Sequence, residues 1–381
     1  MKKLVVLFCF LYIAVNMRAD YTGTITVNPS DVKFENINSY DLISITGYDY
    51  YKQTGYPQVP MQKLRFIIPK FKKVTNVAVT NISETELTGD FNIYPSQPEQ
   101  IMSGPINPFI SPYPTVYNLN QLYPAANFIM DYTTGLRGAK IFQLFFCPVR
   151  YNPVTKKVYL ITSIQYSLTY ADDAANISCP LNMSETAQNI NKNILAANVC
   201  NQQDIDAYYS FSKSNINEVS QVIIITKFSL QANFLKLADT LTKYGIPAKV
   251  YIETDYDASH FPNCLDEQER IRKLIQSKFI DDGSIQHIIL GGNASIIQPR
   301  IVRWANFTTG LENIATDTYF ASIEDNGAVH AWNGDEIMPP VYGEINDGVD
   351  QLVDFSIGRI PVGTPEEADA FLLETVLNFL F

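Results

Sequence analysis

The sequence predicts a multidomain protein in which an all-β sandwich is followed by an α/β domain with a mainly parallel sheet. Over residues 20–170, short runs rich in Val, Ile, Thr, Tyr and Phe are separated by Gly, Pro and Asn, and no segment has a helical period. Over residues 220–381, apolar β-branched runs alternate with amphipathic helical segments, which predicts parallel strands joined by helical crossovers. A length of 381 residues has room for both domains.

Residues 1–19 are predicted to be a signal peptide. A basic start at Lys2 and Lys3 is followed by an unbroken apolar run from Leu4 to Val15, and Ala19 offers a small residue for cleavage. The run is too short to span a bilayer. We therefore expect a secreted, extracellular protein without a membrane span.

The predicted β-sandwich consists of short strands, and a polar joint follows it. The clearest strand candidates are Thr24–Val27, Leu64–Ile68, Val74–Val79, Lys140–Phe146 and Lys157–Ile161. Residues 171–219 are rich in Asn, Ser, Gln and Asp, and this composition predicts an exposed linker with one short helix.

The second domain opens with strands and helices in alternation. The expected strands are Gln221–Thr226, Ile246–Ile252 and His287–Leu290, and the expected helices are Leu230–Tyr244 and Asp266–Phe279. Apolar residues recur on one face of each helix, and Gly245 is a stop signal for the first. This order predicts a parallel sheet under right-handed crossovers.

A further strand and helix complete the printed sequence. Phe355–Val362 reads as a short apolar strand, after which Thr364 and Pro365 open a helix that runs to Phe381. The last residues of this helix are apolar, with no Gly or basic turn to end it. We expect this apolar face to pack against a C-terminal part of the protein.

The net charge and the cysteines limit which binding partners, metals and disulfides can be expected. A net charge of −11 disfavours nucleic acid, which requires a basic footprint. The cysteines outside the leader are Cys147, Cys179, Cys200 and Cys264; export permits disulfides, and no Cys-x-x-Cys pair indicates zinc. Cys179 and Cys200 flank one segment and are candidates to close it as a loop.

A series of short motifs occurs in the order found in one peptidase family. The motifs are Gly55–Pro60, Ile68–Pro69, Gly135–Gly138, Pro148–Pro153, Val222–Thr226, Lys243–Pro247, Ile289–Gly292, Thr316–Tyr319, Gly343–Glu344 and Gly358–Val362. By these motifs the chain resembles the gingipain family of secreted cysteine peptidases. The resemblance implies that residues 20–170 are a propeptide-like domain and that residues 220–381 are a caspase-like peptidase domain, truncated at its C-terminus.

The resemblance also implies hydrolysis of peptide bonds by a Cys thiolate with a nearby His. In the family both residues follow the Gly-Arg-Ile-Pro-Val turn, so we expect the dyad beyond Phe381 and no catalytic residue in this chain. His287 lies in an apolar strand, and neither His260 nor His330 precedes a Gly. Cys264 follows His260 closely but has no orienting third group, and we expect it to be structural.

An acidic segment over residues 317–350 is the candidate metal site. Carboxylates and Asn side chains gathered in loops suit calcium, and the resemblance adds that family members often carry calcium in this region. The candidate ligands are Asp317, Asp335, Glu344, Asp347 and Asp350. The EF-hand pattern is absent, and a solvated acidic loop is the alternative. No Gly-x-Gly-x-x-Gly occurs, so no dinucleotide cofactor is expected.

Two functions are compatible with these observations. The first is the N-terminal fragment of a secreted cysteine endopeptidase precursor, in which the prodomain packs against the peptidase domain and the full-length enzyme acts on protein or peptide substrates. Its activating cleavage is expected near Ser210 to Glu218. The alternative is a non-catalytic secreted binding or inhibitory protein that retains a prodomain and half a peptidase scaffold. The apolar end of the last helix favours the precursor.

Overall fold

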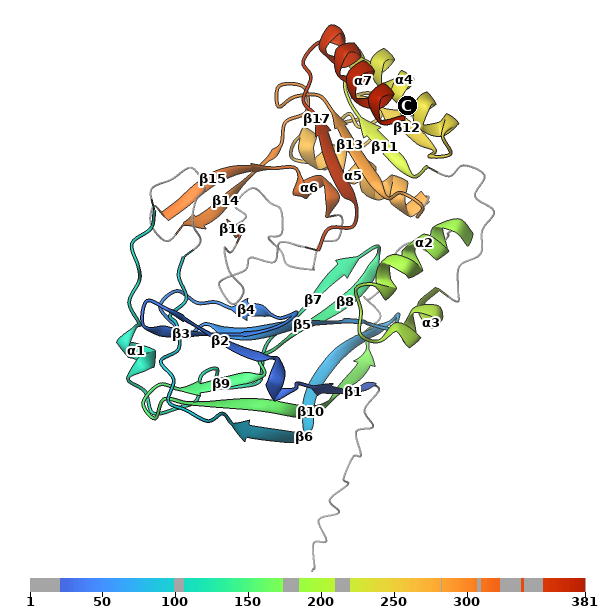
Figure 1. Cartoon of the computed structure of the whole chain (residues 1–381). Coiled ribbons are helices and arrows are strands. Elements are labelled where there is room, and N and C mark those ends of the chain that lie inside the picture. Colours follow the sequence, from blue (N-terminus) through green and yellow to red (C-terminus); the bar gives the residue numbers. More distant parts are fainter. Residues whose placement is uncertain are drawn as a thin grey trace, which may run out of the picture.

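The computed structural model describes residues 21–98, 106–173, 185–209, 220–281, 283–306, 310–322, 337–338 and 352–380. They form a sheet-rich part up to residue 173, a helical pair over residues 185–209 and an α/β part from residue 220 (Figure 1). The predicted signal peptide and Cys179 lie outside these residues. No helix among the described residues is long and apolar enough to cross a membrane.

The sheet-rich part contains two four-stranded antiparallel sheets and a separate hairpin. The first sheet has the order β1–β10–β6, with β9 also paired to β10: β1 (Tyr21–Thr26), β6 (Lys72–Glu86), β9 (Val149–Asn152) and β10 (Lys157–Asp172). The second has the order β4–β5–β8–β7: β4 (Asp49–Tyr51), β5 (Val59–Ile67), β7 (Phe128–Leu136) and β8 (Ala139–Phe146). The hairpin pairs β2 (Val32–Ile37) with β3 (Tyr40–Ile45).

A single apolar core joins the two larger sheets. Phe66 of β5 packs against Phe142 of β8 and against Tyr166 of β10, with ring centroids 6.5 and 6.0 Å apart. Helical structure within this part is limited, in the described residues, to α1 (Pro114–Tyr117) and the short 3-10 turn η1 (Pro29–Asp31). The prediction that the first part is built mainly of β-strands is confirmed.

The segment expected to be an exposed linker is packed over part of its length. Helices α2 (Glu185–Ala196) and α3 (Ile205–Tyr209), with the 3-10 turn η2 (Gln202–Asp204) between them, cover the end of the β5–β8–β7 sheet. Ala187 and Leu195 of α2 are fully buried against Ile141 of β8. The expected exposure is wrong for residues 185–209, which form two packed helices where one short helix was predicted. The few apolar residues that fix these helices are diluted by Asn, Gln and Lys.

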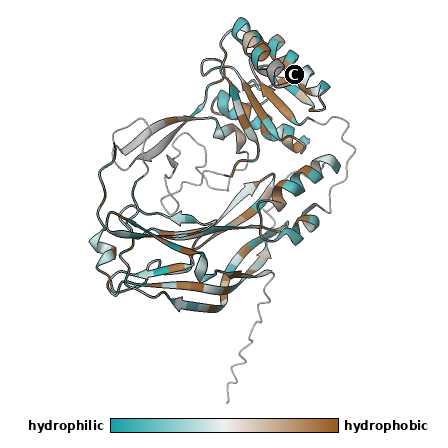
Figure 2. Cartoon of the chain, viewed as in Figure 1, coloured by the Kyte–Doolittle hydropathy of each residue, from teal (hydrophilic) through white to brown (hydrophobic). Residues whose placement is uncertain are grey.

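The α/β part is built on a fully parallel sheet, as predicted. Its strand order is β12–β11–β13–β17, formed by β11 (Val222–Ile225), β12 (Ala248–Tyr251), β13 (His287–Gly291) and β17 (Ser356–Ile360). The central strand β11 is buried along its whole length, because helices cover both faces. Figure 2 shows the resulting apolar colouring of these strands.

The helices divide between the two faces of this sheet. On one face, α4 (Gln231–Lys243) and α7 (Pro365–Leu380) pack on Val222 and Ile224, next to the 3-10 turn η3 (Phe228–Leu230). On the other face, α5 (Glu267–Asp281) and α6 (Thr318–Ala321) pack on Ile223 and Ile225. The side-chain period of two along β11 therefore gives each layer its own core.

A small sheet with the order β15–β14–β16 stands beside the parallel one (Figure 1). It consists of β14 (Arg300–Asn306), β15 (Gly310–Thr316) and β16 (Ile337–Met338). These strands were not expected from the sequence.

We predict that Gly291→Ala destabilises the α/β part by about 1–3 kcal/mol, because an added Cβ would lie 2.6 Å from the buried Phe234 ring. The matched control is Gly358→Ala in the neighbouring strand, where nothing lies within 4 Å of the added atom. Urea unfolding of both variants measures the difference. Equal midpoints for the two variants would contradict the packing of α4 on this strand.

Candidate functional site

The carboxyl ends of the parallel strands meet at one edge of the sheet, which is where open α/β sheets bind ligands. Here β11 leads into Thr226, β13 into Gly292 and β17 into the Pro361–Val362 turn. The amide of Gly292 donates to the carbonyl of Ile360 at 2.9 Å, and Thr226 Oγ1 donates to the carbonyl of Gly291 at 2.6 Å. The strand ends are thus joined to one another at this edge.

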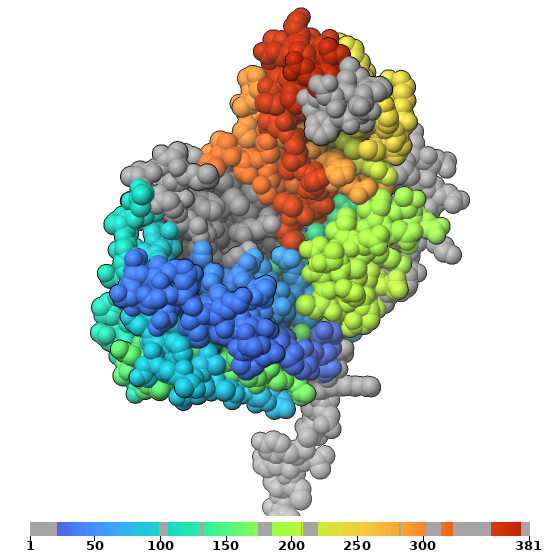
Figure 3. Space-filling model, in the orientation of Figure 1, coloured from blue at the N-terminus to red at the C-terminus, as the bar shows by residue number. Residues whose placement is uncertain are grey.

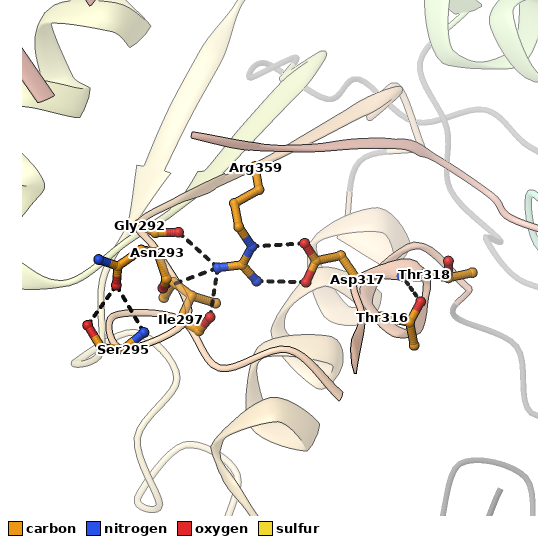
Figure 4. A network of polar contacts seen from close by, with 8 residues as sticks. All are labelled: Gly292, Asn293, Ser295, Ile297, Thr316, Asp317, Thr318 and Arg359. Atoms are coloured by element: carbon orange, nitrogen blue, oxygen red, sulfur yellow. Dashed lines mark hydrogen bonds and ion pairs between the residues drawn. The ribbon is translucent and has the colours of Figure 1, made fainter. Parts of the chain in front are cut away.

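Arg359 organises this edge (Figure 4). Its Nε and one terminal nitrogen donate to the two carboxylate oxygens of Asp317, at 2.9 and 2.6 Å. The other terminal nitrogen donates to the carbonyls of Gly292, Asn293 and Ile297, at 2.8, 3.3 and 2.7 Å. One guanidinium therefore links the end of β17, the loop after β13 and the start of α6.

The loop after β13 is also wound tightly on itself. Asn293 Oδ1 accepts from the amide and the hydroxyl of Ser295, at 2.9 and 2.6 Å, and the Asn293 amide donates to the carbonyl of Val362. Gly292 has a φ of +153°, and an added Cβ would lie 2.4 Å from Ile296. These contacts fix the conformation of the loop at the carboxyl edge of the sheet.

The calcium prediction stays a prediction. Asp317 is the one candidate ligand in the described part of the chain, and both of its oxygens accept from Arg359. The other candidates lie outside the described residues: Asp335, Glu344, Asp347 and Asp350. Among the described residues, no group of three or more His, Cys, Asp or Glu side chains is arranged to hold a metal ion.

The histidines and cysteines that the structure describes do not form a dyad among themselves. His260 Nδ1 contacts Asp257 Oδ1 at 3.0 Å, and no hydrogen bond in the described part joins it to Cys264. Burial, and then the nearby Glu269 carboxylate, raise the pKa of the Cys264 thiol, so its thiolate is disfavoured. His287 begins β13, at the amino edge of the sheet, with Nδ1 2.5 Å from Ser356 Oγ. His330 lies outside the described residues.

The remaining described cysteines are Cys147 and Cys200, and the pKa of each thiol is raised, which disfavours the thiolate. Cys147 lies in the core of the sheet-rich part, where burial raises the pKa of its thiol. Cys200 is an exposed residue, but desolvation of its thiol by the surrounding atoms raises the thiol pKa. Neither forms a disulfide with another described cysteine, and Cys179, the candidate partner of Cys200, lies outside the described residues.

A second arginine was missed as a functional residue by the sequence analysis. Arg137, in the turn between β7 and β8, is completely buried and bonds to carbonyls of the α/β part. Both Arg137 and Arg359 lie in motifs noted in the sequence, Gly135–Gly138 and Gly358–Val362. The sequence feature that could have indicated both residues is an arginine whose direct neighbours in the chain are apolar residues or glycine.

Comparison with known families matches both parts of the chain. A family model described as Propeptide_C25 matches residues 15–208, and one described as Peptidase family C25 matches residues 215–376. A search of curated proteins returns no match.

Among the solved structures that are similar to the chain, three come from Porphyromonas gingivalis. The complex of RgpB pro- and mature domains is 18% identical over 48% of this chain and 91% of its own, with a TM-score of 0.41. A structure on the zymogenic latency of gingipain K is 16% identical over 40% and 100%, with a TM-score of 0.34. Dimeric latent PorU is 12% identical over 86% of this chain and 36% of its own, with a TM-score of 0.29.

The assignment rests on the two family models, since all three TM-scores are below 0.5. A sheet-rich propeptide followed by an α/β peptidase part defines the precursor of a peptidase. The chain belongs to the gingipain family of cysteine peptidases, peptidase family C25.

We predict that Arg359→Lys destabilises the α/β part by about 2 kcal/mol or more, because one ammonium cannot replace a fork that serves a carboxylate and three carbonyls. The control is Lys236→Ala, which breaks the exposed ion pair with Asp369 and costs less than about 1 kcal/mol. Urea unfolding measures both changes. A loss for Arg359→Lys no larger than the control's would refute the organising role of Arg359.

Proposed function

We propose that the protein is a secreted endopeptidase precursor whose mature part cleaves peptide bonds of protein substrates at the carboxyl edge of the parallel sheet. The observation that carries the proposal is the order of the two family matches along one chain, propeptide before peptidase. The rigid loop around Arg359 supports the choice of edge, since a reacting bond must be held in a fixed geometry. The predicted leader over residues 1–19 supports export.

The catalytic chemistry requires a thiolate beside an imidazole. The described cysteines have raised pKa values and no histidine partner, so they do not supply it. We place the dyad in sequence that follows Phe381, because the family resemblance implies that position. The non-catalytic alternative is not favoured, because the chain matches a peptidase model as well as a propeptide model.

Removal of the propeptide would activate such a precursor. The segment between the two parts, residues 210–219, is the site at which one cut separates them, and it coincides with the cleavage region expected from the sequence. Until that cut, the propeptide and the peptidase part are joined in one covalent chain.

We predict that the message continues in frame beyond the codon for Phe381 and encodes a strand ending in His-Gly and then one ending in Cys. Sequencing the transcript tests this directly. A stop codon immediately after Phe381, together with a matching intact mass of the exported protein, would overturn the peptidase proposal for this product.

We further predict that the activated full-length protein loses peptidase activity on treatment with iodoacetamide, while Cys264→Ser retains wild-type activity. The physical reason is that Cys264 has a raised pKa and no imidazole partner, so it is not the nucleophile. Hydrolysis of a denatured protein substrate provides the assay. Inactivation by Cys264→Ser in a correctly folded protein would place the nucleophile within this chain.

A further inference from the structure

The turn between β7 and β8 has an unusual residue at its tip. Leu136 pairs with Ala139, so the turn consists of Arg137 and Gly138, and both have positive φ values of 55° and 77°. Two-residue turns of this kind favour Asn, Asp or Gly at the first position. The β2–β3 hairpin follows that preference, with Asn38 and Ser39 at φ values of 52° and 68°. An arginine here has a local conformational cost that some other contact must offset.

The Arg137 side chain enters the α/β part and is fully shielded from solvent. One terminal nitrogen donates to the carbonyls of Ile285 and Asp354, at 2.5 and 3.2 Å, and the other donates to the carbonyl of Gly283 at 3.1 Å. Its Nε donates to Asn191 Oδ1 at 2.7 Å. A guanidinium cannot lose its proton in a protein, so its burial depends on this set of acceptors.

Two aromatic rings complete the enclosure. The guanidinium carbon lies 4.7 Å from the centroid of the Phe279 ring and 5.1 Å from that of Phe355. The two rings meet each other edge to face, with centroids 5.3 Å apart. Rings around a planar cation and carbonyls along its rim suit arginine, whereas lysine would present a compact, strongly hydrated charge. We call the rings of Phe279 and Phe355 together with the carbonyls of Gly283, Ile285 and Asp354 the guanidinium socket.

The socket lies at the amino edge of the parallel sheet. Gly283 and Ile285 precede β13, and Asp354 and Phe355 precede β17, whereas the loop bound by Arg359 follows the carboxyl ends of the same two strands. In Figure 3 the chain just before and within β17 reaches down beside α2 and α3 to meet the sheet-rich part. The contact with the propeptide is therefore at the opposite end of these strands from the candidate site.

Helices α2 and α3 fix the hairpin tip in place. Asn191 of α2 accepts from Arg137 and donates to the carbonyl of Gly283 at 3.0 Å, so it contacts both sides of the junction. Tyr208 of α3 donates to the carbonyl of Gly138 at 2.8 Å. The backbone amide of Arg137 also donates to Asp354 Oδ1 at 2.5 Å.

We propose that the socket is a guanidinium-binding exosite of the peptidase, which retains the propeptide through Arg137 after the chain between the two parts has been cut. The retention rests on the proposed function only in assuming that such a cut occurs. Three carbonyls and two rings of the peptidase part, together with Asn191 of α2, contact the Arg137 side chain. None of these contacts involves the peptide that connects the two parts. The same site accepts a small guanidinium ligand once Arg137 is absent.

The test uses the full chain with a recognition site for a specific protease inserted within residues 210–219. After cutting, the two pieces of the wild type are expected to elute together in size-exclusion chromatography. In Arg137→Asn the pieces separate, with affinity lowered on the order of 100-fold, because a buried charged anchor is lost. Asparagine is favoured in this turn, so the variant preserves the hairpin, and its circular dichroism and unfolding midpoint check that the propeptide remains folded.

Two controls make the result specific. Arg150→Asn removes an arginine of the same domain that pairs with Glu84, and its pieces are expected to stay together. Millimolar ethylguanidinium is expected to restore association of the cut Arg137→Asn pieces, whereas ethylammonium, with the same charge but no planar fork, is not. Retained association of Arg137→Asn, or equal rescue by both cations, would overturn the proposal. Neither outcome depends on peptidase activity, so the proposed function is tested separately.

A spectroscopic readout follows from the same geometry. Burial lowers the pKa of His287, and the charge of Arg137 lowers it further. We predict that Arg137→Asn raises the pKa of His287 partway to its ordinary value, while Arg150→Asn leaves it unchanged. The chain has three histidines, so proton NMR titration resolves the one concerned. An unchanged pKa in Arg137→Asn would show that Arg137 does not occupy the socket in solution.

Discussion

A permanently charged side chain is buried where the propeptide meets the peptidase part, and much of the structure follows from that constraint. Arg137 cannot be neutralised, so every element around it supplies an acceptor or a ring: the segments before β13 and β17, helix α5 through Phe279, and helix α2 through Asn191. The positive φ of the Arg137 backbone is tolerated because these contacts determine it. The contact between the propeptide and the peptidase part is therefore specific for an arginine at position 137, and two aromatic rings enclose that arginine.

The parallel sheet uses its two edges differently. At the amino edge, carbonyls that precede the strands converge on an arginine supplied by the propeptide. At the carboxyl edge, carbonyls that follow the strands converge on Arg359, which belongs to the sheet itself and is neutralised by Asp317. The propeptide arginine contacts the segments that lead into β13 and β17, and the far ends of the same two strands form the candidate site.

Much of the fold could be predicted from the sequence, because the pattern of apolar residues changes near residue 220. Before it, short strand-like runs follow one another; after it, strand-like runs alternate with segments of helical period. One short helix was expected within residues 171–219, but the second helix and the packing of both were missed, since Ala187 and Leu195 are too sparse among polar residues to signal burial. The strands β14 and β15 were missed because charged and polar residues interrupt them. The socket was beyond sequence reasoning: its acceptors are main-chain carbonyls, which every residue has, and only the tertiary fold brings them to Arg137.

Hydrogen exchange at the Arg137 amide tests the central claim most directly. A turn at a hairpin tip is ordinarily open to solvent, and its first amide exchanges rapidly unless a partner protects it. Here that amide donates to the buried Asp354 carboxylate of the peptidase part. The account predicts that in the intact protein this amide exchanges as slowly as those of the central strand β11. Exchange at the rate of an unprotected peptide would contradict the account, because it would mean that the propeptide hairpin does not dock on the peptidase sheet.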